Sequence, residues 1–377
     1  MTAGPDPAMT PAVPAARPGM GAVLDVALGA VAANWKLLSA RHPSGPVAGV
    51  VKADAYGLGA AAVAPALQAA GCRHFFVAAL DEALALRPLL PGAMLAVLGG
   101  PLPGTVPEYL AHDLVPVLNA PAEIALWSAA ARAAGRRLPA ILHVDTGMAR
   151  LGLEPRAVAA LHDDPAALAG LDLRYVMTHL VSAEAAGDPL NEAQARRFAA
   201  ACAALPPAPR CFANSSGIFL GPAFGSDLAR PGAALWGINP TPGRPNPMHP
   251  VVRLRARVLA VRDLGPGETV GYNATFAAAR PSRIATAAIG YADGWRRAFS
   301  NRGAARFDGA RVPLVGRVSM DLTTFDVTDH PRVVPGVWLD LIGPGQDVDA
   351  AAADAGTIGY EVLTGLASRV QRIHHPA

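Results

Sequence analysis

The chain has 377 residues, of which 52% are hydrophobic, and its formal net charge is +3. This length accommodates two domains, or one barrel with an appended domain, and the apolar content is ample for a sizeable core. The small net charge, with no basic block, gives no support for nucleic-acid binding. The apolar stretches are Ala-rich and broken by Pro or Gly, so none is expected to span a membrane.

The beginning of the chain and its cysteines bear on the cellular compartment. Residues 1–19 are rich in Pro and Ala and lack an apolar core segment, which indicates a disordered lead-in and not a secretory signal. Cys72, Cys202 and Cys211 are odd in number and show no metal or redox spacing. We therefore expect free thiols in a reducing cytoplasm and no metal site.

From about residue 22 to residue 238, short β-like runs alternate with Ala-rich helical stretches. In chain order these are 47–51 then 60–71, 74–79 then 80–90, 94–99 then 105–112, 114–118 then 121–135, 140–144 then 155–162, 173–179 then 191–205, and the runs 210–213 and 233–238. Such regular alternation predicts an α/β fold, a parallel sheet closed as a TIM-like (β/α)8 barrel, over residues 20–245.

The pattern changes after Pro240. Residues 241–247 form a turn-rich linker with three prolines. Beyond it, alternating strand patterns occur at 251–261, 283–289, 311–318, 322–327 and 337–342. We expect a mainly β C-terminal domain over residues 246–377.

Lysine is almost absent from this chain. Of 32 basic residues only Lys36 and Lys52 are lysines. Lys36 fits a solvated position on a helical stretch, whereas Lys52 ends an apolar run and is followed by a turn. An ε-amine can lose its proton and attack a carbonyl, which a guanidinium cannot do. From the residues alone, Lys52 is either an amine nucleophile or half of a buried ion pair.

Lys52 opens the segment Lys-Ala-Asp-Ala-Tyr-Gly-Leu-Gly, which resembles the cofactor-lysine motif of alanine racemases. Further matches follow in that family's order along most of the chain. They are His143-Val-Asp-Thr-Gly-Met-Ala-Arg-Leu-Gly, Thr178-His, Ala213-Asn-Ser, Arg230-Pro-Gly, Val270-Gly-Tyr, Ile289-Gly-Tyr-Ala-Asp-Gly, Val315-Gly-Arg-Val-Ser-Met-Asp and Gly359-Tyr-Glu. The resemblance implies a homodimeric, cytoplasmic enzyme that uses pyridoxal 5'-phosphate to interconvert L- and D-alanine and so supplies D-alanine for peptidoglycan.

Two residues carry the implied chemistry. The α-proton of an amino acid is too weakly acidic for ordinary side chains, so a cofactor must delocalise the resulting charge. The resemblance assigns Lys52 the covalent attachment of the cofactor and the role of base on one face. The base on the opposite face is implied to be Tyr272 of the partner subunit. Phenols are poor bases at neutral pH, and the resemblance places His179 and Arg230 beside it.

The remaining site residues also follow from the resemblance. Arg230 is implied to hydrogen-bond the pyridine nitrogen, and it leaves that nitrogen unprotonated because a guanidinium has no acceptor. The phosphate is implied to contact Tyr56, Ser215, Gly232, Ala233 and Tyr360. The implied substrate contacts are Arg150, Met320 and Tyr291.

One departure from the family pattern concerns the positioning of Arg150. Many relatives have a carbamylated lysine where this chain has His143, and imidazole cannot form that stable carbamate. Leu58 and Asn273 are two further departures from the family pattern, and both are expected to be tolerated. Three rivals remain: a racemase of other or broader specificity, a decarboxylase with the same barrel, which Arg230 disfavours, and a non-catalytic cofactor-binding protein.

Overall fold

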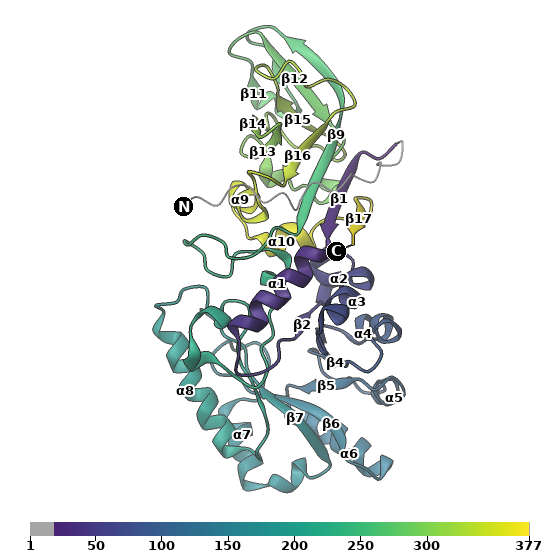
Figure 1. Ribbon diagram of the computed structural model, residues 1–377, viewed down its shortest axis with the longest axis vertical. Coiled ribbons are helices and arrows are strands. Elements are labelled where there is room, and N and C mark those ends of the chain that lie inside the picture. The colour runs from purple at the N-terminus through teal and green to yellow at the C-terminus, as the bar shows by residue number, and fades with distance from the viewer. Residues whose placement is uncertain (1–18, 377) are drawn as a thin grey trace. The chain divides into compact units, whose positions relative to one another are not determined.

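The computed structural model describes residues 19–376, so the expected lead-in at residues 1–19 lies almost wholly outside the described residues (Figure 1). Contacts divide the described chain into two compact units. One comprises residues 27–251, and the other combines residues 19–26 with residues 252–375. These limits differ from the predicted 20–245 and 246–377 because β1 (Ala22–Ala27) pairs antiparallel with β9 (Val252–Leu264).

The first unit is built on a parallel sheet with the strands in sequence order. Its strands are β2 (Gly49–Val50), β3 (His74–Val77), β4 (Met94–Val97), β5 (Val115–Leu118), β6 (Leu138–His143), β7 (Leu171–Met177) and β8 (Arg210–Cys211). Parallel bridges join Cys211 to Leu228 and Val47 to Ala229. Residues 228–229 therefore connect the two edges of the sheet, and this closure confirms the predicted barrel.

The predicted strand at 233–238 was wrong. Ala233–Trp236 is a 3-10 helix, η6, and residues 228–229 take the eighth position instead. The side chains of Leu235 and Trp236 are fully buried. A short buried apolar run has the same appearance in a strand and in a buried helical turn, which explains the error.

Helices follow most of the strands. They are α1 (Leu28–Arg41), α3 (Ala60–Ala70), α4 (Leu80–Leu86), α5 (Val106–Ala111), α6 (Pro121–Ala134), α7 (Pro155–Asp163) and α8 (Pro189–Ala204). Helices α5 to α8 each carry proline in the first turn, where the missing N–H would have no partner within the helix. The barrel interior is filled by apolar side chains from successive strands, among them Phe76, Val117 and Ile141. Among the described residues, no helix is both long and apolar enough to cross a membrane.

The second unit is mainly β, as predicted. Its larger sheet is organised by the long strand β9, which pairs with β1, with β12 (Ser282–Ala287) and with β16 (Trp338–Ile342). The other elements are β10 (Thr269–Val270), β11 (Phe276–Ala277), β13 (Ala304–Phe307), β14 (Ala310–Pro313), β15 (Thr323–Asp326), β17 (Gln371–His375), α9 (Val348–Asp354) and α10 (Gly359–Thr364). Asp25 on β1 accepts a hydrogen bond from Nε of Arg255 on β9 at 2.8 Å and contacts His375 on β17 at 2.9 Å, which ties three strands together.

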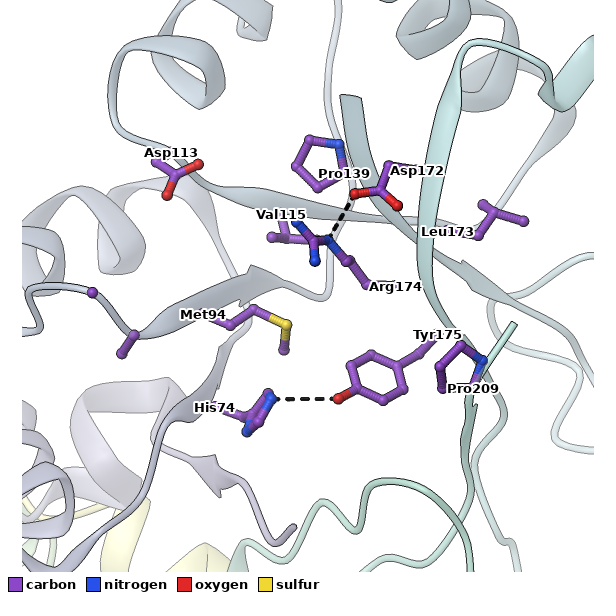
Figure 2. A pocket seen from close by; sticks show the side chains of 12 residues that line it. His74, Met94, Asp113, Val115, Pro139, Asp172, Leu173, Arg174, Tyr175 and Pro209 are labelled. Atoms are coloured by element: carbon purple, nitrogen blue, oxygen red, sulfur yellow. Dashed lines mark hydrogen bonds and ion pairs between the residues drawn. The ribbon is translucent and has the colours of Figure 1, made fainter. Parts of the chain in front are cut away.

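A hollow of about 470 Å³ lies at the N-terminal ends of the barrel strands (Figure 2). Its lining includes His74 and Met94, which begin β3 and β4, and residues of β7. The Oη of Tyr175 lies 3.3 Å from Nε2 of His74, and Arg174 pairs with Asp172 at 3.1 Å. This hollow is at the end of the barrel opposite to Lys52, which follows the C-terminal end of β2.

Candidate active site

Lys52 stands at the start of an unusual turn. In α2 (Lys52–Gly57) four consecutive non-glycine residues have positive φ: Ala53 at 52°, Asp54 at 53°, Ala55 at 53° and Tyr56 at 58°. This is a left-handed helical turn, and L-residues disfavour that conformation by roughly 1–2 kcal/mol each. Strain of this kind persists only where the surroundings hold it, and it gathers at functional sites.

Two carboxylates hold the left-handed turn in place. Oε1 of Glu82 accepts the N–H of Ala53 at 2.5 Å, while its Oε2 accepts the N–H of Ala78 at 2.7 Å at the end of β3. Oδ1 of Asp54 accepts the N–H of Ala60, the first residue of α3, at 2.7 Å. Sequence reasoning missed Glu82, whose only signal was an acidic residue in the first turn of the helix after β3.

The electrostatic surroundings of Lys52 favour its neutral amine. Burial lowers the pKa of Lys52, and the charges of Arg150 and Arg230 lower it further, while Glu82 opposes them. A neutral amine is the nucleophilic form. The buried-ion-pair alternative is not favoured, because the pKa of a lysine with a dominant acidic partner would rise. Lys36, in contrast, is exposed on α1.

Arg230 is buried just after residues 228–229, which close the barrel. Its Nη2 donates to the carbonyl oxygen of Thr178 at 2.8 Å, and its Nη1 donates to the carbonyl oxygen of Cys211 at 3.2 Å. Its guanidinium also lies over the ring of Phe76. The side chain is thereby fixed at the C-terminal ends of β7 and β8 by neutral acceptors, so its positive charge acts on the neighbouring groups.

Two histidines at this mouth are neutral at physiological pH. Burial and the charge of Arg230 lower the pKa of His179 to about 3 and that of His143 to about 4. His143 ends β6, and its Nδ1 lies 2.8 Å from Oδ1 of Asn119. Asn119, which follows β5, is a second residue that sequence reasoning missed, because nothing in its local sequence distinguishes it from a turn residue.

The phosphate-contact residues predicted in the barrel unit gather in one place. Oγ of Ser215 accepts the N–H of Gly232 at 3.1 Å and the N–H of Ala234 at 3.2 Å. A Cβ on residue 232 would collide with the Oη of Tyr56, so glycine is required for this close approach. Ala233 begins η6 beside them. A hydroxyl, a phenol and backbone N–H groups in one cradle suit a phosphate group.

The other predicted residues belong to the second unit. Tyr272 begins the 3-10 turn η7 (Tyr272–Ala274), and its side chain is 66% exposed. The N–H of Tyr291 donates to the carbonyl oxygen of Ser319 at 3.0 Å, which brings Tyr291 beside the loop that carries the exposed Met320. Tyr360 lies in α10. The structure thus joins Lys52 to its predicted neighbours in one unit and places this second group in the other.

A closed barrel with a lysine of lowered pKa at its C-terminal mouth, joined in sequence to a β domain, defines a class of lysine-dependent enzymes. The family model for the alanine racemase N-terminal domain matches residues 26–240, and the model for the alanine racemase C-terminal domain matches residues 251–374. The chain belongs to the alanine racemase family, whose members are pyridoxal-phosphate-dependent isomerases. The predicted family, fold class and enzyme class are confirmed.

Individual relatives support the same assignment. The alanine racemase of Acidiphilium cryptum is 59% identical over 92% of this chain and 96% of its own length. A catabolic alanine racemase of Mesorhizobium japonicum is 49% identical over 95% of this chain and 94% of its own. The crystal structure of alanine racemase from Bartonella henselae, which has covalently bound pyridoxal phosphate, is 40% identical with a TM-score of 0.91 and covers 94% of this chain and 99% of that one.

Proposed function

We propose that this protein interconverts L- and D-alanine by a two-base mechanism with pyridoxal 5'-phosphate bound through Lys52. The observation that carries the proposal is the position of Lys52 after the C-terminal end of β2, on a left-handed turn that the carboxylates of Glu82 and Asp54 hold in place. The charges of Arg150 and Arg230 support it, because they lower the pKa of Lys52 together with burial. Bound there, the cofactor would supply the electron sink that makes the α-proton of an amino acid removable. The cradle of Tyr56, Ser215 and Gly232 would hold its phosphate.

The barrel residues have distinct roles in this proposal. The neutral amine of Lys52 removes or returns the α-proton on one face of the substrate. Arg230 would donate to the cofactor's ring nitrogen and, because a guanidinium cannot give up its proton, would leave that nitrogen unprotonated. Arg150, exposed at the same mouth, pairs with the substrate carboxylate.

The second base in the proposal is Tyr272 of the partner subunit. Its support is the exposed position of Tyr272 on η7, where the phenol is free to enter another chain's site. Asn301 braces this turn: its Nδ2 donates to Oγ1 of Thr275 at 3.1 Å, and its Oδ1 accepts the N–H of Gly316 at 2.6 Å. Met320 and Tyr291 would line the same site from the partner subunit, and Tyr360 would complete the phosphate contacts.

Tyr272→Phe tests the two-base assignment. The variant keeps Lys52, so we expect the cofactor to bind and solvent deuterium still to exchange with the α-proton of D-alanine. Exchange from L-alanine should fall by roughly 10²–10⁴-fold, because a positioned base contributes about that much. The two exchange rates are measured by NMR. Equal loss from both enantiomers would contradict the assignment.

Mixing two inactive variants tests the shared site. Lys52→Ala and Tyr272→Ala subunits, allowed to exchange, should form heterodimers that contain one intact site and recover activity. Mixing two preparations of the same variant is the matched control. Continued inactivity after verified subunit exchange would show that both bases come from one chain.

We also propose that the product supplies cell-wall synthesis in the cytoplasm. The three free cysteines support a reducing compartment, since two of them are buried and none is paired. A catabolic role is the second candidate, because the relatives from Mesorhizobium japonicum and Agrobacterium fabrum are catabolic alanine racemases. Deleting the gene separates the roles: D-alanine auxotrophy indicates supply, whereas loss of growth on alanine indicates catabolism.

A further inference from the structure

Both neighbours of Lys52 in the chain are tied to β3 and to the turn that follows it. On one side, the N–H of Val51 donates to the carbonyl oxygen of Phe76 on β3 at 2.9 Å. On the other side, the N–H of Ala53 donates to Oε1 of Glu82 at 2.5 Å. The first N–H groups of a helical turn have no partner within the turn, so the N–H of Ala53 needs an acceptor from elsewhere. The backbone at Lys52 is therefore held from both sides.

Each of the two carboxylate oxygens of Glu82 has its own donors. Glu82 is the third residue of α4, and its Oε2 accepts the N–H groups of Ala78 at 2.7 Å and Ala79 at 3.2 Å, just before the helix begins. This is a common role of a glutamate at the third position of a helix. The other oxygen, Oε1, reaches the N–H of Ala53. One side chain thus joins the turn after β2 to the turn after β3.

A second glutamate of the barrel occupies the same helical position and serves as an internal comparison. Glu123 is the third residue of α6, and its Oε2 accepts the N–H of Asn119, which follows β5, at 2.6 Å. Like Glu82, it joins the first turn of its helix to the strand before it. Glu82 combines this local cap with the contact to Ala53, which is 29 positions away in the chain. A substitution of Glu123 therefore controls for the loss of a cap.

The negative charge of Glu82 also acts on the amine. Burial and the positive charges of Arg150 and Arg230 lower the pKa of Lys52, and Glu82 is the carboxylate that opposes them. Two further titratable groups at this mouth are neutral at pH 7, the rings of His143 and His179. A base must be able to hold the proton that it removes. A carboxylate near the amine supports this, because it stabilises the protonated form.

We propose that Glu82 is a positioning residue for Lys52: its carboxylate fastens the turn that carries the lysine to the end of β3, and its negative charge counters those of the two nearby arginines. The backbone contacts fix where the amine stands, and the charge keeps the amine able to take up a proton. The proposal rests on the proposed function only in the role of Lys52 as a base, because the contacts themselves need neither cofactor nor substrate.

Amide hydrogen exchange, followed by NMR on the protein carrying its cofactor, tests the backbone contact. Ala53 is an exposed residue, yet we expect its N–H to exchange at least about tenfold more slowly than an unstructured amide, as a hydrogen bond to a charged group requires. Glu82→Met removes both acceptor oxygens and should abolish this protection, whereas Glu123→Met should preserve it. An unprotected Ala53 N–H in the wild-type protein would overturn the proposal, even if Glu82→Met does not fold.

Nitrogen NMR of the lysines tests the effect of the charge. The chain has only two lysines, so ¹⁵N labelling of lysine gives two Nζ signals, and Lys36→Arg assigns them. The full-length protein is freed of cofactor so that the amine can titrate. Glu82→Gln nearly preserves the shape but removes the charge, so the midpoint of Lys52 should move to a lower pH. Glu123→Gln should leave that midpoint in place. A Lys52 midpoint that stays unchanged in Glu82→Gln would overturn the proposal.

Steady-state kinetics test the consequence for the reaction. Glutamine has a single acceptor oxygen, so Glu82→Gln cannot serve both turns at once, and the amine should lose its exact placement. We expect kcat for alanine to fall by about tenfold or more, because a small misplacement of a reacting group is costly. KM should change less, since the lysine does not bind the substrate carboxylate. Glu123→Gln is the matched control and should keep the wild-type kcat.

The outcomes separate this proposal from the proposed function. A wild-type kcat in Glu82→Gln, or an equal loss in Glu123→Gln, overturns the positioning role. A wild-type protein that does not racemise alanine would overturn the proposed function, whereas amide exchange at Ala53 and the titration of Lys52 would still decide the role of Glu82.

Discussion

Both ends of the barrel carry charged and titratable side chains, but these side chains are arranged differently. At the N-terminal mouth, Asp172 pairs with Arg174, and the Tyr175 phenol pairs with the His74 ring across a hollow of about 470 Å³ (Figure 2). At the C-terminal mouth, Lys52 lies within the electrostatic reach of Arg150 and Arg230, with Glu82 as the opposing carboxylate.

The difference teaches that the arrangement of charges distinguishes the reactive end of the barrel. Opposite charges at the N-terminal mouth stabilise one another, which is the arrangement expected of structural groups. Like charges at the C-terminal mouth raise one another's energy. Arg230 is buried there, and the turn that begins at Ala53 has positive φ angles. Such costs are typical of sites where a shifted pKa serves chemistry.

The largest expected effect comes from removing the amine. Lys52→Ala should lower racemisation by at least about 10³-fold, because it removes the base and the attachment point of the cofactor. Borohydride should fix cofactor to the wild-type protein at Lys52, as peptide mass mapping would reveal. His74→Ala at the other mouth should keep both properties. Borohydride fixation of the cofactor at Lys36 would contradict the assignment of the reactive amine to the C-terminal mouth.

An intermediate effect is expected in the pH dependence of stability. The pKa of His143 is lowered to about 4 in the folded protein, so below about pH 6.5 the unfolded chain binds the proton first and stability falls as the pH falls toward 4. Between pH 7 and pH 5 this residue should account for about 2 kcal/mol of lost unfolding free energy.

Urea unfolding of His143→Gln at the two pH values measures this contribution, because glutamine does not titrate. His112→Gln, at an exposed position just after α5, is the matched control substitution. A His143→Gln variant with the same loss of stability as wild type would show that the ring is already charged in the folded protein.

At the low end of the expected effects, we expect bicarbonate to have no influence on the racemisation rate. Lys36 and Lys52 are the only lysines, so no lysine carbamate can form at His143. Degassing, or adding bicarbonate at fixed pH, should therefore leave the racemisation rate unchanged. A clear bicarbonate dependence would show that the positive charges of the C-terminal mouth recruit an anion, and the contrast between the two mouths would need revision.

Much of the fold could be predicted from local sequence, whereas the site residues other than Lys52 followed only from the family resemblance. Strand and helix patterns depend on residues a few positions apart, and they located β3 to β7 and the helices after them. Lys52 was recognisable because it is a scarce residue at the end of an apolar run. The roles of Tyr272, Met320 and Tyr360 stay predictions, and the complementation and exchange experiments test that of Tyr272.

The sequence by itself determined the β/α alternation, the β domain and the identification of Lys52 as a candidate reactive residue. Each of these follows from composition or from patterns among residues a few positions apart. Only the tertiary structure decided the left-handed turn at 53–56, the support from Glu82 and the amide that orients His143. These depend on contacts between residues distant in the chain: Ala53 meets Glu82, and Asn119 meets His143 from the neighbouring strand. Barrel closure by residues 228–229 has the same cause, because Leu228 and Ala229 are defined as strand only by their bridges to Cys211 and Val47.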